Sequence, residues 1–286
     1  MISIISCSIK PELCQKMFAS IQNTIGTEFE QIIIDNREKK YSLFKAYNEG
    51  AMQAKGKYLL FIHEDIEIKN MNWGAELVKF AEQDNDCGVI GVAGNKFLPR
   101  NFWAWSSPHK YNVIRLYGPK EKDHLDKKCF SLFYNNPRNE LFSKAVCLDG
   151  VFLFVKKNIW EKNKFDEINY NGFHFYDADF TFKIAQTYQN FVYLGMDIYH
   201  YSIGNRNKDF CESLLIFHKL WKHAIPYTLP CFKISILNEL TSAFNIYKTF
   251  KKNKYKKREI LKILFDKNGY LFMILFFLRY PQIIFI

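Results

Sequence analysis

The feature that most constrains the fold is a regular alternation of two patterns over the first hundred residues. Short apolar runs with the length and composition of buried strands occupy 1–8, 31–35, 57–62 and 88–93. Apolar residues at helical spacing fill the intervals 12–25, 42–54 and 73–83, and Gly56 is expected to end the second helix as its C-cap. Because such alternation with short connections builds a parallel sheet with helices on both faces, we predict an α/β fold with a Rossmann-like, mostly parallel central sheet.

The remainder of the chain continues this domain and then changes character. Residues 97–146 are irregular and indicate loops and short strands, whereas 148–156 and 191–194 are typical of strands and 176–188 of a helix. From about residue 232 the pattern is helical, first basic and then apolar. We predict one α/β domain over 1–225 and a helical C-terminal extension over 226–286.

The positive charge is concentrated in that extension. The chain carries a net charge of +11, and the segment 248–262 contributes +7 of it through eight Lys or Arg against Glu259, which leaves +4 for the remainder. A nucleic-acid surface needs basic residues spread over a docking face, so no nucleic-acid partner is expected. A single basic run beside an apolar tail favours an anionic membrane surface, with a solvated helix face as the alternative.

The apolar tail is too short to cross a membrane. Residues 270–278 form nine apolar positions before Arg279, whereas a spanning helix needs about 20. Together with the basic run, this pattern predicts an interfacial anchor. The alternative is a helix packed on the enzyme or on a dimer partner, so the sequence leaves the oligomeric state open.

The cysteines and the first residues bear on location. Seven scattered cysteines form no CxxC pair, which is typical of a reducing compartment: Cys7, Cys14, Cys87, Cys129, Cys147, Cys211 and Cys231. The opening MISIISCSI lacks the basic start and long apolar stretch of a signal peptide. We expect a cytoplasmic location, peripheral on the inner face of the cytoplasmic membrane if the tail is an anchor.

Polar residues at the carboxyl ends of the predicted strands are the first candidates for a site, since ligands of open α/β sheets bind there. The strongest local signal is KGKYLLFIHEDIEI, in which a buried strand delivers Glu64, Asp65 and Glu67 to a loop. Mg²⁺ usually takes one or two carboxylates and completes its shell with phosphates and water. The segment therefore favours a metal site, although acids after a strand are also common as turn residues.

The run AYNEGAMQAKGKYLLFIHED, residues 46–65, resembles the corresponding segment of family 2 glycosyltransferases, which have the GT-A fold. The matching positions are Asn48, Gly50, Ala54, Gly56 and the strand 58–62. The family's acidic motif is commonly Asp-x-Asp, and here it is His63-Glu64-Asp65. The resemblance implies that Asp65 is a metal ligand and leaves the role of His63 open; His is a poor ligand for Mg²⁺ but acceptable to Mn²⁺.

Further elements follow in the family's order. The resemblance implies that 1–100 is the nucleotide-binding half and 101–225 the acceptor-side half. It also implies a set of donor-binding side chains: Ser6, Ser8, Asp35, Asn48, Glu64, Asp65 and Asp149. Among them, Asp35 matches the acid that binds the base, and a carboxylate is suited to accept from a uracil-like imide N–H. Asp149 would bind a sugar hydroxyl, although Asp149-Gly150 is also a common turn pair.

Two later motifs complete the expected site. GFHFYDADFTFKI resembles the family's Glu-Asp motif with Tyr176 in place of Glu, which implies that Asp177 is the general base; a sugar hydroxyl needs one because it is a poor nucleophile until its proton is removed. The alternative is that Asp177 and Asp179 only stabilise a helix N-terminus. In MDIYHYSIGN, His200 matches a second metal ligand, with a structural His as the alternative.

The resemblance covers residues 1–205 and implies a function. The chain is expected to transfer a sugar from a nucleotide-diphosphate sugar, with UDP-sugar favoured, to a hydroxyl of a glycan or lipid-linked acceptor. Mn²⁺ or Mg²⁺ is the expected cofactor, inversion the expected stereochemistry, a hexosyltransferase the expected class and bacterial surface polysaccharide assembly the expected pathway. The alternatives are a catalytically impaired nucleotide-sugar-binding protein and a nucleotidyltransferase. A nicotinamide dehydrogenase is disfavoured because SCSIKPEL after the first strand lacks its glycines.

Overall fold

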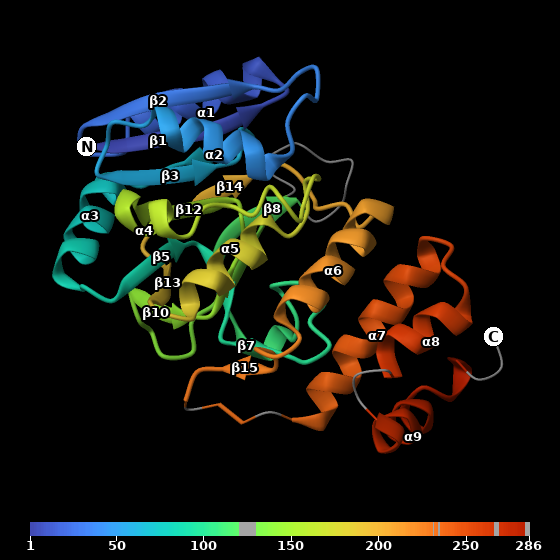
Figure 1. Ribbon diagram of the computed structural model, residues 1–286. Coiled ribbons are helices and arrows are strands. Elements are labelled where there is room, and N and C mark those ends of the chain that lie inside the picture. The colour runs from blue at the N-terminus through green and yellow to red at the C-terminus, as the bar shows by residue number, and fades with distance from the viewer. Residues whose placement is uncertain (120–129, 231, 234, 266–268, 284–286) are drawn as a thin grey trace.

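The computed structural model describes residues 1–119, 130–230, 232–233, 235–265 and 269–283. The predictions for Cys129 and Cys231 as free thiols, and for the last three tail residues, fall outside these ranges. The other five cysteines are free thiols. The predicted fold class is confirmed: a central sheet is flanked by helices, and the C-terminal region is helical (Figure 1).

A seven-stranded sheet forms the centre of the molecule, in the order β10-β13-β5-β12-β3-β1-β2. The strands are β1 (Ile2–Ser8), β2 (Phe29–Asp35), β3 (Tyr58–Ile62), β5 (Cys87–Gly91), β10 (Phe142–Ala145), β12 (Phe152–Lys156) and β13 (Gln189–Tyr193). The β12 strand inserts antiparallel between β3 and β5, and β10 pairs antiparallel with β13 at one edge. Five strands therefore share one direction, and their carboxyl ends lie on one side of the sheet.

Helices cover both faces because the central strands are apolar at consecutive positions. The helices are α1 (Pro11–Gln22), α2 (Leu43–Gln53), α3 (Trp73–Gln83), α4 (Lys157–Lys162) and α5 (Tyr176–Ala185). Side chains alternate along a strand, so Leu60 enters the core under α1 and α3, whereas Phe61 enters the core under α2 and α5. Both side chains are completely buried.

The prediction that Gly56 caps the C-terminus of α2 was wrong. The α2 helix ends at Gln53, followed by Ala54 in an extended conformation, so Gly56 does not cap it. A Cβ on Gly56 would lie 2.7 Å from Ser3 Oγ and 2.9 Å from the carbonyl oxygen of Met1. The Gly56 N–H donates to Ser3 Oγ over 2.8 Å. Glycine is needed here because the start of β3 approaches β1 too closely for a side chain.

A second sheet was not predicted as such. Its order is β11-β6-β8-β14-β4, and β9 pairs with β8. The strands are β4 (Ile66–Ile68), β6 (Ala93–Asn95), β8 (Asn112–Pro119), β9 (Phe130–Asn135), β11 (Cys147–Leu148) and β14 (Ile198–His200). Most are too short to carry a periodic signal. Glu67, expected in a loop, lies in β4 and accepts a hydrogen bond from Tyr201 Oη over 2.8 Å.

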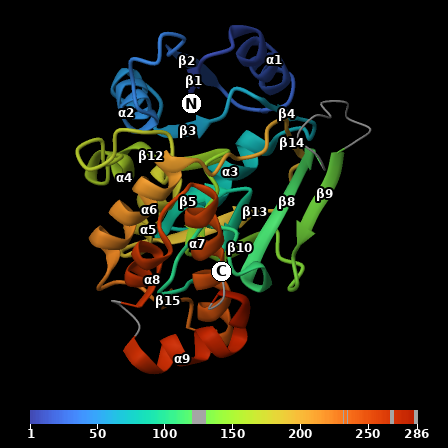
Figure 2. The same ribbon diagram turned by 90° about the vertical axis from the view of Figure 1, so that its right-hand side faces the viewer.

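The C-terminal helices pack beside the α/β domain, away from its sheet (Figures 1 and 2). They are α6 (Lys208–Trp221), α7 (Ile236–Lys252), α8 (Lys257–Phe265) and α9 (Gly269–Arg279); short 3-10 turns are η1 (His109–Tyr111) and η3 (Pro281–Ile283). Between α6 and α7, β15 (Tyr227–Thr228) pairs with β7 (Phe97–Leu98). The boundary at 225/226 stays a prediction, and the extension shares the main core through residues such as Leu240 and Phe250.

Within the described ranges, every helix falls short of the length and apolar character that a membrane crossing requires.

Candidate active site

Two strand ends bring together a group of three side chains that could hold a metal ion. His63 and Asp65 follow β3, and His200 ends β14. Their ligand atoms all lie within 4.8 Å of one another. Asp65 Oδ1 is 3.4 Å from His200 Nε2 and 4.0 Å from His63 Nδ1. The pairing of β14 with β4 sets His200 opposite Ile66, which fixes this proximity across 135 residues of sequence.

His63 and Tyr176, the two residues that depart from the family motifs, contact each other. Tyr176 Oη lies 2.6 Å from His63 Nε2, which leaves His63 Nδ1 directed toward Asp65 and His200. A metal-ligating imidazole usually uses its second nitrogen in such an outer hydrogen bond, which fixes its tautomer and orientation. Gly150 completes this packing, because a Cβ there would lie 1.9 Å from Tyr176 Oη.

The charges of the three side chains depend on one another. Burial alone would raise the pKa of Asp65, but the hydrogen bond from His200 and the positive charges of His200 and His63 hold it well below its usual range. Burial alone would lower the pKa of His200, but the Asp65 carboxylate outweighs burial and raises it. Burial, followed by the charge of His200, lowers the pKa of His63. A neutral imidazole is the form that ligates metal.

Asp177 lies at the first turn of α5, on the other side of Tyr176. Its Oδ2 accepts from the Gly150 N–H over 3.1 Å, and its Oδ1 accepts from the Ala178 N–H over 2.8 Å. Burial, reinforced by the negative charge of Asp149, raises the pKa of Asp177 to about 7. The negative charge of Asp149 also acts to raise the pKa of His63 and that of His200. The carboxylates of Asp65, Asp149 and Asp177 and the two imidazoles therefore form one electrostatic unit. A carboxyl group that titrates near neutrality is suited to proton transfer.

Asp179, two residues on, has a different environment. It is 1% exposed, accepts from the Trp221 indole N–H over 2.9 Å and pairs with Lys183 at 3.5 Å. Its carboxylate therefore joins α5 to α6. Of the two acids in this motif, Asp177 shares Asp149 as an electrostatic neighbour with His63 and His200, whereas Asp179 contacts Trp221 and Lys183.

The predicted donor-binding side chains around β1 lie together, and two of them, Ser8 and Glu64, are engaged within the protein. Ser8 Oγ donates to Glu64 over 2.7 Å, and Glu64 also accepts from the N–H groups of Ile9 and Lys10. Glu64 thereby satisfies backbone donors where β1 leads into α1. Ser6 is fully buried in the same strand, and among the described residues its Oγ has no hydrogen-bond partner. The contacts of Ser8 and Glu64 shape the loop at the carboxyl end of β1 rather than present free polar groups.

Asn48 and Asp35 are placed differently. The Asn48 side chain is 3% exposed, donates to the Phe165 carbonyl over 2.9 Å and accepts from the Phe165 N–H over 3.1 Å. Asn48 thus ties α2 to the segment after α4. Asp35 is exposed at the end of β2, and its hydrogen bonds with Arg37 lower the pKa of the carboxyl to about 2.

His63 is the main residue whose role sequence reasoning left open, and the structure supplies its neighbours. Its position was visible as His-x-Asp at a strand end, but its partners were not. One partner is Tyr176, 113 residues later in the sequence, and the other is His200, whose Nε2 lies 3.4 Å from His63 Nδ1. No local pattern encodes those distances.

Comparison with known proteins identifies the family. The model described as "Glycosyltransferase like family" matches residues 3–211, well over half of the chain and all of the residues grouped above. The chain belongs to this glycosyltransferase-like family. The expected family is therefore confirmed, over a range that extends through His200.

Individual relatives of this glycosyltransferase-like chain are distant. A Fuscovulum blasticum protein named "ATP synthase subunits region ORF 6" is 24% identical over 186 residues, 63% of this chain and 66% of that protein, slightly less than two thirds of its length. GalNAc-T7, crystallised with UDP, GalNAc and Mn²⁺, aligns at 12% identity and TM-score 0.49 over 91% of this chain and 50% of its own. S. aureus TarS 1–349 in complex with UDP aligns at 13% identity and TM-score 0.47 over 90% and 73%.

The electrostatic unit makes a testable prediction about His200. In the metal-free protein, Asp65→Asn removes the carboxylate that raises the pKa of His200, so burial dominates and that pKa should fall below its ordinary value of about 6.5. The His200 ring resonances in an NMR pH titration measure this. Asp35→Asn is the matched control, because it removes an equal charge from an exposed position. An unchanged His200 midpoint in Asp65→Asn would contradict the arrangement.

Proposed function

We propose that this glycosyltransferase-like protein transfers a sugar from a UDP-sugar to a hydroxyl of a glycan or lipid-linked acceptor, with a divalent cation and with inversion. The observation that supports the proposal is that Asp149 acts electrostatically on two kinds of group: the imidazoles of a cluster able to ligate a metal, and a carboxyl group, Asp177, whose pKa is raised to about 7. Nucleotide-sugar transfer needs both, because charge must be neutralised on the leaving diphosphate and a proton must be removed from the acceptor.

The donor would lie over the carboxyl ends of β1, β2 and β3. The loop shaped by Ser8 and Glu64 supports the nucleoside end, and Asp35 is the exposed carboxylate able to accept from the imide N–H of uracil. Ser6 and Asn48, which are buried, would then act indirectly, by fixing the backbone that the donor contacts. Asp149, beside Asp177, is suited to bind a hydroxyl of the donor sugar.

The residues present fit a divalent cation. His63, Asp65 and His200 offer two imidazoles and one carboxylate, a set better suited to Mn²⁺ than to Mg²⁺, which prefers oxygen ligands. A bound cation would neutralise the diphosphate and act as a Lewis acid on the departing oxygen. Tyr176 would hold the His63 ring in the orientation that keeps Nδ1 toward the ion.

Asp177 would accept the proton of the acceptor hydroxyl as that oxygen attacks the anomeric carbon. Burial and the charge of Asp149 make its carboxylate a stronger base than an exposed aspartate. The N–H groups of Gly150 and Ala178 keep the carboxylate oriented. A single displacement with one base on the acceptor side inverts the configuration at the anomeric carbon.

The pH dependence tests the assignment of Asp177. The base must be deprotonated, so kcat/KM should rise with pH through about 7 and then level off. Asp149→Asn should move the midpoint to lower pH, because it removes the negative charge that helps raise the pKa of Asp177. Asp177→Asn should lower kcat by about 10²–10⁴-fold with donor affinity retained. Near wild-type turnover in Asp177→Asn would rule out its role as the base.

The choice of metal tests the role of His63. Mn²⁺ should raise Tm more than Mg²⁺ at equal concentration, since ligand binding to the folded state stabilises it. His63→Asp recreates an Asp-x-Asp-like motif and should reduce the preference for Mn²⁺ over Mg²⁺ in both Tm and donor cleavage. His223→Asp, at an exposed position outside the site, is the control. Donor binding without any Mn²⁺-dependent cleavage would instead favour a non-catalytic nucleotide-sugar-binding protein.

We further propose that the C-terminal extension holds the enzyme on an anionic membrane surface, as an enzyme of surface polysaccharide assembly acting on a lipid-linked acceptor would require. Phe272 and Phe276 of α9 are buried against the neighbouring helices, which agrees in part with a packed tail. The opposite face remains apolar and exposed, with Leu271 at 70% and Leu278 at 73%. Exposed lysines of the basic run lie nearby in sequence and suit anionic headgroups.

Vesicle flotation tests the membrane proposal. Leu271→Ser/Leu278→Ser should lower the affinity for phosphatidylglycerol vesicles at least about tenfold, because two apolar side chains no longer enter the interface. These substitutions leave the buried face of α9 intact, whereas truncation at residue 245 would remove core residues. Met52→Ser/Ile168→Ser, at exposed positions elsewhere, is the matched control. Equal flotation of all three proteins would defeat the anchor.

A further inference from the structure

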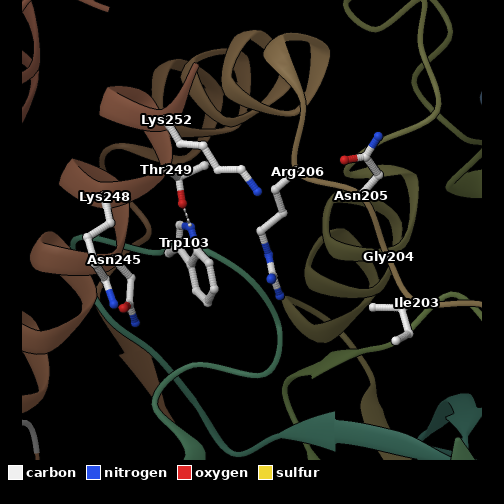
Figure 3. Close-up of a pocket in the computed structure, with 9 residues that line it drawn as sticks. All are labelled: Trp103, Ile203, Gly204, Asn205, Arg206, Asn245, Lys248, Thr249 and Lys252. Carbon is white, nitrogen blue, oxygen red and sulfur yellow. Dashed lines mark hydrogen bonds between the residues drawn. The ribbon is translucent and has the colours of Figure 1, made fainter. Parts of the chain in front are cut away.

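A cavity of about 380 Å³ lies between the loop that follows β14 and the α7 helix. Figure 3 shows its walls: Trp103 faces Arg206 from the loop on one side and Lys248, Thr249 and Lys252 from α7 on the other. None of these residues belongs to the group of His63, Asp65 and His200 or was singled out as a site residue from the sequence. The C-terminal extension therefore builds one wall of a cavity whose other wall comes from the α/β domain.

The cavity is a built structure rather than a gap between side chains. The Trp103 indole N–H donates to Thr249 Oγ1 over 2.8 Å, which joins the α/β domain to α7. The Arg206 guanidinium carbon lies 4.2 Å from the centroid of the Trp103 ring, and the Arg206 carbonyl accepts from Asn253 Nδ2 over 2.9 Å. Stacking thus orients the Arg206 guanidinium, and the hydrogen bond from Asn253 holds its backbone.

The charge of the cavity calls for an anion. Arg206, Lys248 and Lys252 supply three positive charges, and no carboxylate lines the cavity. Across the described part of the chain, the ion pairs with carboxylates involve other cations than these three. Clustered cations without counter-ions raise the local concentration of anionic ligands. An arginine beside two lysines is a typical set for a phosphate group, and the Asn205 and Asn245 amides add neutral hydrogen-bonding groups.

The position of the cavity relates it to the reaction site. The Tyr201 N–H donates to the carbonyl of Asp65 over 3.0 Å, so the loop begins at the candidate metal ligands. Ile203, the first loop residue to line the cavity, is three residues after His200, a separation of at most about 11 Å. The loop ends at Asn207, whose Oδ1 lies 3.1 Å from His174 Nε2, close in sequence to Asp177. One loop therefore runs from the candidate metal ligands, along the cavity, to a contact with His174, three residues before Asp177 in the sequence.

We propose that this cavity binds a phosphate group of the acceptor, and that the basic run of the sequence is divided between two tasks. Lys248 and Lys252 serve the cavity, and the remaining basic residues of the extension serve the surface. The identification of the ligand as an acceptor rests on the proposed transferase function, whereas the anion site itself does not depend on that function. A phosphate held here would fix the acceptor at a set distance from Asp177, and neutral glycans would lack that contact.

The experiment measures binding of inorganic pyrophosphate by calorimetry in EDTA, without donor, so that no metal-dependent donor site contributes. Lys248→Gln/Lys252→Gln should weaken pyrophosphate binding about tenfold, because two of three cations are lost. Lys79→Gln/Lys162→Gln is the matched control: both lysines are exposed, lie on helices and are outside the cavity, so the same charge is removed without loss of binding. Equal affinity in the cavity variant, or equal loss in both variants, would overturn the proposal.

A second measurement identifies where the phosphate comes from. If flotation of Lys248→Gln/Lys252→Gln on phosphatidylglycerol vesicles falls together with its pyrophosphate affinity, the phosphate is that of a lipid. If flotation is unchanged while pyrophosphate affinity falls, the phosphate is that of a soluble acceptor ester. Mn²⁺-dependent donor cleavage is measured on the same proteins. If the wild-type protein does not cleave the donor, the transferase function is excluded and the anion site is unaffected. If the protein cleaves the donor but does not bind pyrophosphate, only the anion site is excluded.

Discussion

The antiparallel pairing of β14 with β4 is the contact on which the candidate site depends. It places His200 opposite Ile66 and joins the Tyr201 N–H to the Asp65 carbonyl, so an imidazole from late in the sequence reaches a carboxylate from the first half. Strand pairing fixes such positions far more tightly than loop contacts do, because each residue is held by its ladder. The same loop then leads from His200 to Arg206 and the basic cavity. One short ladder therefore positions both the candidate metal ligands and the wall of the proposed acceptor site.

The site places several carboxyl groups where burial disfavours negative charge, and this explains why their pKa values differ. Asp65 stays ionised because His200 compensates its charge, whereas burial and the charge of Asp149 raise the pKa of Asp177 to about 7. The charge of Asp149 helps to raise the pKa of Asp177 and also that of His200. The two carboxylates thereby acquire different properties from their surroundings. One is suited to hold a cation and the other to exchange a proton.

The two departures from the family pattern compensate for each other. An Asp-x-Asp motif and a Glu-Asp motif would place carboxylates where this chain has His63 and Tyr176. Here a hydrogen bond of 2.6 Å joins the imidazole to the phenol, so the pair is internally satisfied without adding negative charge to a buried region. Substitution of either residue alone would leave its partner short of a hydrogen bond. Considered together, the two departures place an imidazole in the candidate metal cluster and give it a hydrogen-bond partner in Tyr176.

The sequence by itself determined the alternating α/β core, the family resemblance, the helical extension and the identity of Asp65, Asp177 and His200 as candidates. These follow from local patterns: strand and helix periodicity, and short motifs at strand ends. Tertiary structure alone decided that His63 joins Asp65 and His200, that Tyr176 orients it, and that Glu64 and Asn48 are engaged by backbone groups. It also decided that two lysines of the basic run line the same cavity as Trp103 and Arg206. The physical reason is that short strands, side-chain pairs and cavity walls depend on distances between segments far apart in the chain, which no local periodicity encodes.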